Sequence, residues 1–208
     1  MKIDLSANER KYLQEVLSFT EAEKYIKKFN NKIFVIKYGG SALNDKYLAN
    51  NFAKDLVLIK KLGINIVIVH GGGFQISETL KKKKLDSKFI NGLRVTDKKT
   101  IKIVKKVLIE RINKKIVDLI IEAGGKAISL PGHKKSLIEV KPLKKEMGFV
   151  GNPKKIKIKI IQNIIKRNCI PIIASLGFKG KKVFNINADT VAGELASSLS
   201  ATRFYFIT

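Results

Sequence analysis

Two glycine clusters, each directly after an apolar run, hold the residues best suited to chemistry. Lys37-Tyr38-Gly39-Gly40-Ser41 follows KIFVI, and His70-Gly71-Gly72-Gly73 follows INIVIV. Glycine lets the backbone approach a ligand closely, and a helix that follows offers free N–H groups and a positive dipole end to an anion. Two such loops close together predict a site that holds two anionic groups at once. Transfer of a phosphoryl group to a carboxylate requires that arrangement.

This chemistry needs cations rather than a general base. A side-chain carboxylate is already ionised at pH 7, so its phosphorylation depends on charge neutralisation and alignment. The sequence shows no evident His–carboxylate or Ser–His constellation. We therefore expect His70 to be a strand-end residue satisfied by backbone groups. We expect His133, in a PGH turn, to be exposed.

Two cationic residues stand out from the many lysines. Lys37 lies at the C-terminal end of the first predicted strand, where open α/β sheets bind ligands, although a surface charge is the alternative. Arg94 is one of five arginines among 42 basic residues. A guanidinium offers a planar fork that an ammonium cannot imitate, so we expect Arg94 to hold a carboxylate.

A polar group near the C-terminus offers further candidates. Asn185, Asn187 and Asp189 are spaced i, i+2, i+4, so in an extended stretch their side chains face the same way. The alternative is that Asn187 caps the next helix and that Asp189 is an acid favoured in its first turn. Both interpretations are compatible for Asn187.

The elements that must position these residues alternate between strand and helix. We predict strands at 32–38, 64–70, 126–130, 170–175 and the final RFYFIT, and helices at 47–62, 74–84, 97–123, 159–168 and 190–200. The longest helix keeps Val104, Leu108, Ile112, Ile116 and Ile120 on one face. Apolar strands that alternate with helices predict a mainly parallel sheet covered by helices on both faces.

Two segments depart from this alternation. In residues 136–158, apolar and polar residues alternate within SLIEVKPL and within IKIKI, and the turn-like segment GFVGNP lies between the two. This pattern predicts a β-hairpin excursion. Further on, GFKGKK reads as a turn. In the first thirty residues, capping boxes at 6–9 and 20–23 predict two successive helices.

Composition sets the class of protein. The 208 residues, 45% of them hydrophobic, predict one globular domain with no membrane-spanning run and no signal peptide. Cys169 stands alone, which fits a reducing cytoplasm. The net charge is +25, but lysines are spread over almost every helix, so we expect solvated helix faces. Functional nucleic-acid binding would favour clustered arginines.

The motifs occur in an order that resembles a known family. KYGG, HGGG, NGLRVT (91–96), GFVG (148–151), IPIIASLG (170–177) and NINAD (185–189) resemble N-acetylglutamate kinases of the amino acid kinase superfamily, from about residue 30 to the end. The resemblance implies an α/β fold, a three-layer α/β/α sandwich. It also implies phosphorylation of the side-chain carboxylate of N-acetyl-L-glutamate by ATP in arginine biosynthesis, with Mg²⁺ bound through the phosphates.

The resemblance also assigns roles to residues. It makes Lys37 and Asp189 catalytic, Lys37 contacting the transferred phosphoryl group and Asp189 orienting the lysines. Backbone N–H groups of the first loop would bind phosphates and those of the second the substrate carboxylate, while Arg94 and Asn185 would hold the α-carboxylate. The glycines concerned are Gly39 and Gly40 in the first loop and Gly72 and Gly73 in the second.

The resemblance divides the chain near residue 30. Residues 1–30 resemble the N-terminal helical extension of arginine-inhibited members, which implies L-arginine as feedback inhibitor and a homo-oligomer, dimer or hexamer. Residues 31–208 match the substrate-binding part of the kinase domain. The family's nucleotide-binding half, with a second catalytic lysine, follows the strand that ends here at Thr208. We therefore expect these residues to bind N-acetylglutamate weakly and not to turn over ATP.

Three alternatives stay open. A sister kinase of the superfamily would act on carbamate, aspartate, glutamate, UMP or a carrier-bound aminoadipate. A non-catalytic subunit would use the N-terminal helix to join a full-length kinase. A basic nucleic-acid binder is the last alternative, and the scattered lysines count against it.

Overall fold

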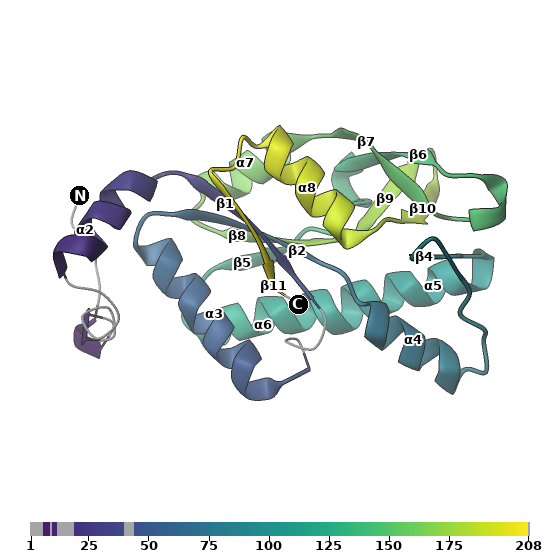
Figure 1. Ribbon diagram of the computed structural model, residues 1–208, viewed down its shortest axis with the longest axis horizontal. Helices are drawn as coiled ribbons and strands as arrows, with labels where there is room; N and C mark the ends of the chain where they lie inside the picture. The colour runs from purple at the N-terminus through teal and green to yellow at the C-terminus, as the bar shows by residue number, and fades with distance from the viewer. Residues whose placement is uncertain (1–5, 9, 12–18, 40–43, 208) are drawn as a thin grey trace.

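A five-stranded parallel sheet forms the centre of the molecule, seen in a computed structural model that describes residues 6–8, 10–11, 19–39 and 44–207 (Figure 1). The strand order is β11-β1-β2-β8-β5. The strands are β1 (Ile33–Tyr38), β2 (Asn65–His70), β5 (Ala127–Ser129), β8 (Ile170–Ala174) and β11 (Arg203–Ile207). The prediction of a mainly parallel sheet is confirmed, and each predicted strand of this sheet is present.

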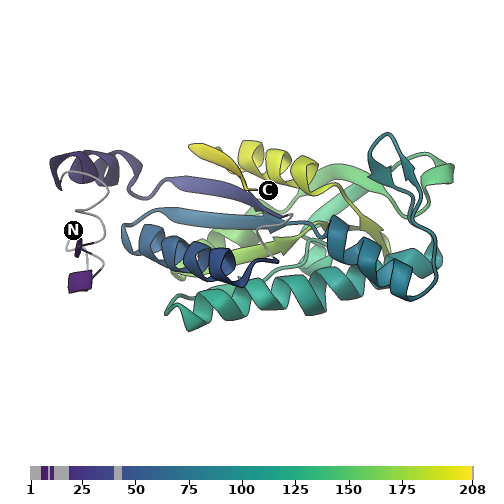
Figure 2. The same ribbon diagram turned by 60° about the horizontal axis from the view of Figure 1, so that its bottom comes forward.

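Helices cover both faces of this sheet, because successive residues of its central strands point to opposite faces. In β2, Ile66 and Ile68 join the core beneath α3 (Lys46–Lys61) and the long helix, while Val67 and Val69 join the core on the opposite face. That second core includes residues of α7 (Ile158–Lys166) and α8 (Ala188–Ser198). The three-layer α/β/α sandwich is therefore confirmed, and Figure 2 shows the layers from another side.

The long predicted helix is one continuous rod, but its middle segment is π-helical, which was not predicted. It consists of α5 (Lys98–Lys106), a π-helical segment (Val107–Asn113) and α6 (Lys114–Glu122). In an α-helix, residues four apart are offset by about 40°, so a five-member stripe at that spacing would turn through about 160°. The wider π turn corrects this drift. All five predicted stripe residues are accordingly buried.

A second, four-stranded sheet carries the predicted hairpin excursion. Its order is β10-β9-β6-β7, formed by β10 (Lys182–Asn185), β9 (Leu176–Lys179), β6 (Ile138–Pro142) and β7 (Gly151–Ile156). The antiparallel β6–β7 hairpin is confirmed, but its boundaries were predicted wrongly. Residues 151–153 belong to β7 rather than to the turn, and α7 begins within IKIKI. Pro153 is accommodated because β7 is an edge strand.

Two short hairpins were not predicted. The segment read as the GFKGKK turn forms the β9–β10 hairpin, which turns at Gly180 with φ +56°. The second hairpin joins β3 (Phe89–Ile90) to β4 (Leu93–Arg94), after α4 (Gly73–Lys82). Both hairpins connect neighbouring strands with the two-residue loops common in antiparallel sheets.

The described part of the N-terminal region contains helix α2 (Phe19–Phe29). Phe29 is buried and meets Phe34 of β1 edge to face, with ring centroids 5.3 Å apart. The earlier predicted helix lies mostly outside the described residues, and the domain division at residue 30 stays a prediction. No helix in the described ranges is long and apolar enough to cross a membrane.

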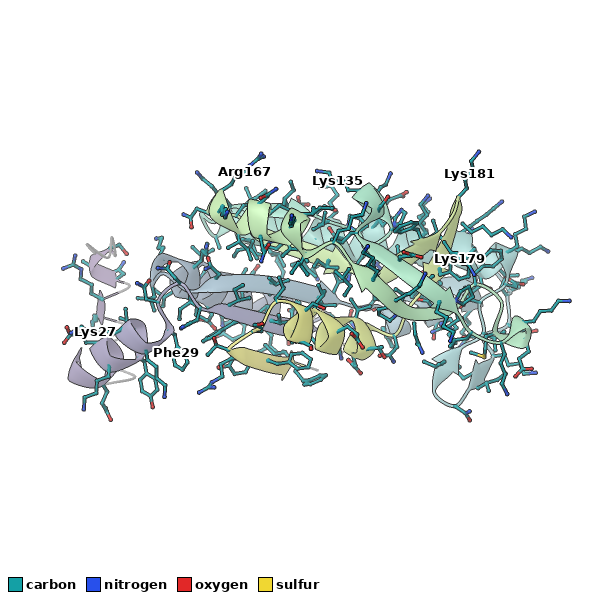
Figure 3. All side chains as sticks on the ribbon, turned by 90° about the horizontal axis from the view of Figure 1, so that it is seen from above. Lys27, Phe29, Lys135, Arg167, Lys179 and Lys181 are labelled. Carbon is teal, nitrogen blue, oxygen red and sulfur yellow. The ribbon has the colours of Figure 1, made fainter. Side chains whose placement is uncertain are left out.

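The basic side chains are spread over the molecule rather than gathered into one patch (Figure 3). The labelled cations protrude from separate places: Lys27 from α2, Lys135 from the 3₁₀ helix Lys134–Ser136 that follows β5, Arg167 from the end of α7, and Lys179 and Lys181 from the β9–β10 hairpin. All five are exposed. This distribution agrees with the expectation of solvated lysines.

Candidate active site

A cavity of about 210 Å³ lies at the carboxyl ends of β1, β2 and β8. Carboxyl ends of parallel strands are where open α/β sheets bind ligands. Seven of the eight residues predicted for the site line this cavity; Gly40 lies outside the described residues. The seven are Lys37, Gly39, Gly72, Gly73, Arg94, Asn185 and Asp189. Their roles stay predictions, but the structure brings them together.

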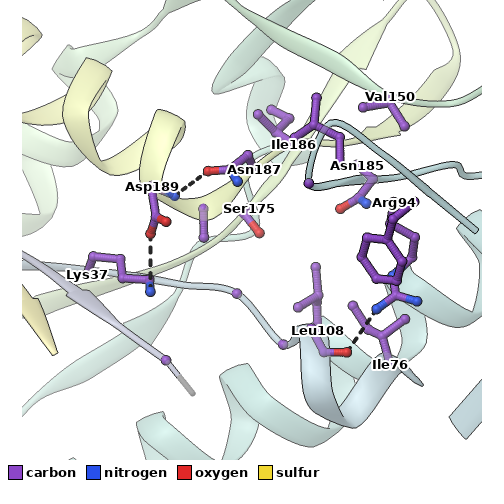
Figure 4. A pocket seen from close by; sticks show the side chains of 18 residues that line it. Lys37, Ile76, Arg94, Leu108, Val150, Ser175, Asn185, Ile186, Asn187 and Asp189 are labelled. Atoms are coloured by element: carbon purple, nitrogen blue, oxygen red, sulfur yellow. Dashed lines mark hydrogen bonds and ion pairs between the residues drawn. The ribbon is translucent and has the colours of Figure 1, made fainter. Parts of the chain in front are cut away.

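An ion pair lies at one end of the cavity (Figure 4). Lys37 Nζ lies 3.1 Å from Asp189 Oδ1; the lysine side chain is 13% exposed and the aspartate side chain 53%. Asp189 stands in the first turn of α8, not in an extended stretch as one interpretation had it. The Asn187 side chain caps that helix, because its Oδ1 accepts from the backbone N–H groups of Asp189 and Thr190 at 2.8 and 3.0 Å.

The second glycine loop leads directly into α4. A side chain at Gly72 would force its neighbours to shift, since a Cβ there would lie 2.3 Å from Ile112 Cδ1 and 2.9 Å from Leu108 Cδ2. At Gly73 a Cβ would meet nothing within 4 Å, so its surroundings are open. The first N–H groups of a helix have no partner within the helix. This loop therefore suits an anionic group that comes close to the backbone.

In the first loop, Gly39 lines the cavity, but its N–H is already engaged. It donates to the carbonyl oxygen of Ile207 in β11 at 3.1 Å. The expected donation from Gly39 to a phosphate is therefore not available in this arrangement.

Arg94 is placed by a short hairpin. Asn91 and Gly92 both have positive φ, +49° and +76°, and form the two-residue turn between β3 and β4. Asn-Gly is the preferred pair for a type I′ turn, because both positions need positive φ. This dipeptide within NGLRVT was the sequence signal for the hairpin, and the turn pairs Arg94 with Phe89 across the two strands.

The guanidinium of Arg94 is buried at the opposite end of the cavity from Lys37 (Figure 4). It donates to the Gly73 carbonyl at 2.9 Å, to Ser77 Oγ at 2.8 Å and to Ser87 Oγ. It also lies over the Phe89 ring, 4.6 Å from the centroid. Burial lowers its pKa from the usual arginine value. No ion pair of Arg94 with an acidic side chain is found among the described residues, so its charge suits an anionic ligand.

Asn185 lies beside Arg94 at that end of the cavity (Figure 4). Its Nδ2 approaches Thr96 Oγ1 at 3.4 Å, and this hydroxyl donates to the Arg94 carbonyl at 2.8 Å. The backbone N–H of Asn185 donates to the carbonyl of Phe149 at 2.9 Å. The side chain thus has hydrogen-bonding capacity left for a ligand.

Several lining residues were missed by the sequence analysis. They form a largely apolar wall of Ile76, Phe89, Leu108, Val150 and Ile186, with Ser175 at the end of β8. Leu108 had been read only as part of the buried helix stripe. Val150 lies in GFVG, Ser175 in IPIIASLG and Ile186 in NINAD, so their motifs gave a signal for these three.

The structure agrees with the expectation for His70 but not with that for His133. His70 is fully buried and its Nδ1 contacts the Gly71 carbonyl at 3.1 Å, as expected of a residue satisfied by backbone. His133 was wrongly expected to be exposed. It is half-buried and both ring nitrogens are buried without a hydrogen-bond partner among the described residues. Burial, with Lys105 and Lys134 nearby, lowers its pKa to about 4.

Known proteins are similar to this chain over most of its length. The acetylglutamate kinase of Novosphingobium aromaticivorans is 41% identical, over 94% of this chain and 71% of its own length. That of Caldanaerobacter subterraneus is 46% identical, over 95% and 68%. A crystal structure of a Streptococcus mutans protein is 33% identical, with TM-score 0.80 over 85% of this chain and 72% of its own. The amino acid kinase family pattern matches residues 32–208. The chain therefore belongs to the amino acid kinase family, and within it to the acetylglutamate kinases.

Proposed function

We propose that this cavity binds N-acetyl-L-glutamate and serves the ATP-dependent phosphorylation of its side-chain carboxylate, in arginine biosynthesis. The observation that carries the proposal is the buried Arg94 at one end and Lys37 at the other, with the glycine loop between. N-acetyl-L-glutamate has a carboxylate at each end, and a cavity of about 210 Å³ suits a molecule smaller than the usual drug-sized ligand.

In this proposal the two carboxylates have different environments. The α-carboxylate lies against Arg94 and Asn185, and the side-chain carboxylate lies toward Lys37 and the glycine loop. The apolar wall that includes Leu108 and Val150 suits the acyl group, for which free glutamate has no counterpart. This wall and the names of the relatives favour N-acetylglutamate over the substrates of the sister kinases.

The reaction then needs no proton transfer. An oxygen of the ionised side-chain carboxylate attacks the γ-phosphorus of ATP, the bond to the ADP oxygen breaks, and ADP leaves with that electron pair. Lys37 stabilises the negative charge on the transferred group, and Asp189 holds the ammonium in place at 3.1 Å. ATP brings Mg²⁺ through its own phosphates. His70 does not line the cavity and both of its ring nitrogens are engaged, by Asn113 and by the Gly71 carbonyl, so it takes no part as a base.

Regulation, assembly and location belong to the proposal as well. Residues 1–30 resemble the extension of arginine-inhibited members, so we propose L-arginine as inhibitor and a homo-oligomer as the working form. The single cysteine fits a cytoplasmic enzyme. Native mass spectrometry with and without L-arginine tests the assembly, and a monomer under both conditions would contradict it.

Isothermal titration calorimetry tests the central proposal. We expect the 208-residue chain to bind N-acetyl-L-glutamate and to bind L-glutamate much more weakly, because L-glutamate lacks the acyl group and adds an ammonium. Equal affinity for the two, or no binding of either, would contradict the proposal. A parallel assay with ATP, in which hydroxylamine traps the acyl phosphate, measures turnover separately and tests the expectation that these residues alone are inactive.

A further inference from the structure

Two fully buried polar side chains meet directly beneath the glycine loop. His70 is the last residue of β2, and Asn113 is the last residue of the π-helical segment. Asn113 Nδ2 lies 2.9 Å from His70 Nε2 and donates to the Ile172 carbonyl of β8, also at 2.9 Å. The pair therefore ties the long helix to two strands of the sheet at the edge where the cavity lies.

The hydrogen-bond partners fix the proton on the histidine. The Ile172 carbonyl can only accept, so the Asn113 amide must present its NH₂ group, and the second N–H of that group faces His70 Nε2. Nε2 must then accept, which leaves the proton on Nδ1. Nδ1 donates it to the Gly71 carbonyl at 3.1 Å. Burial supports this neutral ring, because it lowers the pKa of His70 to about 4.

This arrangement sets the direction of one peptide in the loop. In a trans peptide the carbonyl and the following N–H point in opposite directions. With the Gly71 carbonyl held by His70, the N–H of Gly72 points away from the histidine. Ile112 and Leu108 of the same π-helical segment fill the space where a Gly72 side chain would be. The segment thus restrains the loop in two ways. One is a hydrogen-bond relay, from Asn113 to His70 and from His70 to the Gly71 carbonyl, and the other is direct packing on Gly72.

The relay carries a free-energy cost that an apolar side chain packed at the same place would not have. Asn113 Oδ1 is buried and has no hydrogen-bond partner among the described residues. An unsatisfied buried carbonyl oxygen destabilises a fold, and an apolar residue of similar size would avoid that penalty. An asparagine here is therefore explained by what its NH₂ group does for His70.

We propose that Asn113 and His70 are positioning residues, which orient the Gly72 N–H toward the anionic group of the substrate. Neither side chain lines the cavity, so they act through the glycine loop. The inference rests on the proposed function, because it names how that site is held ready for N-acetyl-L-glutamate.

Nuclear magnetic resonance tests the proton position on the unmodified chain. The sequence has only two histidines, so the His70 ring is assigned by comparison with a His133→Gln variant. We expect a neutral ring at pH 7 with its proton on Nδ1. A proton on Nε2, or a charged ring, would overturn the inference whatever the ligand does.

Calorimetry with N-acetyl-L-glutamate tests the functional consequence. We expect Asn113→Leu and His70→Leu to weaken binding about five- to tenfold, the effect of one lost hydrogen bond in the loop. His70→Asn should restore most of the affinity, since its amide nitrogen can take the place of Nδ1 and donate to Gly71. The matched control is Ile116→Val, a buried position of the same rod, which should lower Tm without changing affinity.

The outcomes distinguish a failure of the positioning inference from a failure of the proposed function. If the unmodified chain binds and folded Asn113→Leu binds equally well, the positioning inference is overturned alone. If His70→Asn is as weak as His70→Leu although both fold, the relay to Gly71 is overturned too. If the unmodified chain does not bind N-acetyl-L-glutamate, the proposed function fails and this inference falls with it.

Discussion

Replacing Arg94 with lysine perturbs the cavity while keeping a positive charge in it. A guanidinium has five N–H donors, and three of them are used by Ser87, Ser77 and the Gly73 carbonyl. Two donors remain for a substrate carboxylate. An ammonium has three donors, so if it satisfies the same protein groups it has none left for the ligand.

The size of the effect follows from those lost donors. A hydrogen bond to a charged group contributes about 1.5–3 kcal/mol, and some direct charge attraction remains in the variant. We expect Arg94→Lys to cost about 2–3 kcal/mol of binding, which corresponds to about 30- to 150-fold weaker affinity for N-acetyl-L-glutamate. Because the charge is kept, the fold should be retained, and circular dichroism should show an unchanged spectrum.

The pH dependence of that variant gives an independent check. Burial lowers the pKa of Arg94, yet arginine starts so high that it stays charged. The same burial acts on a substituted lysine, which starts near 10.4. The variant should therefore lose further affinity as pH rises from 7 to 9.5, while the unmodified chain changes little.

Arg111→Lys is the matched control, since Arg111 is an exposed arginine whose guanidinium lies 4.0 Å from Glu78 at the surface. It should bind as the unmodified chain does. If Arg94→Lys also bound within twofold of the unmodified chain, Arg94 would not hold a substrate carboxylate and the reasoning from its buried charge would be wrong.

Three further predictions concern other parts of the site. Asp189→Asn removes the counter-ion 3.1 Å from Lys37, so acylation of Lys37 at pH 8, followed by mass spectrometry, should accelerate. Its Tm should change little, because the Asp189 side chain is 53% exposed and solvent screens the pair, which then contributes under about 1 kcal/mol; unchanged labelling would argue against the pair. Gly72→Ala places a Cβ 2.3 Å from a neighbouring side chain and should cost about 1–3 kcal/mol in urea unfolding, with weaker ligand binding. An unaffected variant would show that the loop is not closely packed. The His70 pKa of about 4 lies below the unfolded value near 6.5, so the unfolded chain binds more protons between these values. The contribution of His70 to the free energy of unfolding should therefore be complete above pH 6.5 and fall as pH drops toward 4. A free energy of unfolding that does not change with pH in the unmodified chain, or a pH dependence that is the same in His70→Asn, would contradict this.

Local patterns in the sequence were sufficient to predict most elements. Apolar runs such as INIVIV are long enough for a strand buried on both faces, and a glycine pair or cluster marks where a strand ends and a ligand loop begins. The cap at Asn187 follows from the same kind of local information, because its partners are two and three residues away. The β6–β7 boundaries were harder, since IKIKI satisfies both a strand and the first turn of a helix.

The π-helical segment shows where local reasoning stops. The apolar stripe at intervals of four predicted a buried helix face, but not that the backbone widens at Val107–Asn113. The widened segment carries Leu108, which lines the cavity, and Asn113, which contacts His70. A sequence pattern records which residues are apolar, not which other segment each one meets.

By itself, the sequence determined the layers of the fold, the order along the chain of the strands and helices of the main sheet, and the residue types suited to phosphoryl transfer. Tertiary structure alone decided how these residues meet. Arg94 reaches the Gly73 carbonyl across 21 residues of chain, Asn113 reaches His70 across 43, and Asn185 approaches Thr96 across 89. It also decided that the Gly39 N–H is taken by β11. The physical reason is that short-range periodicity sets burial, whereas contacts distant in sequence depend on how buried faces pack together.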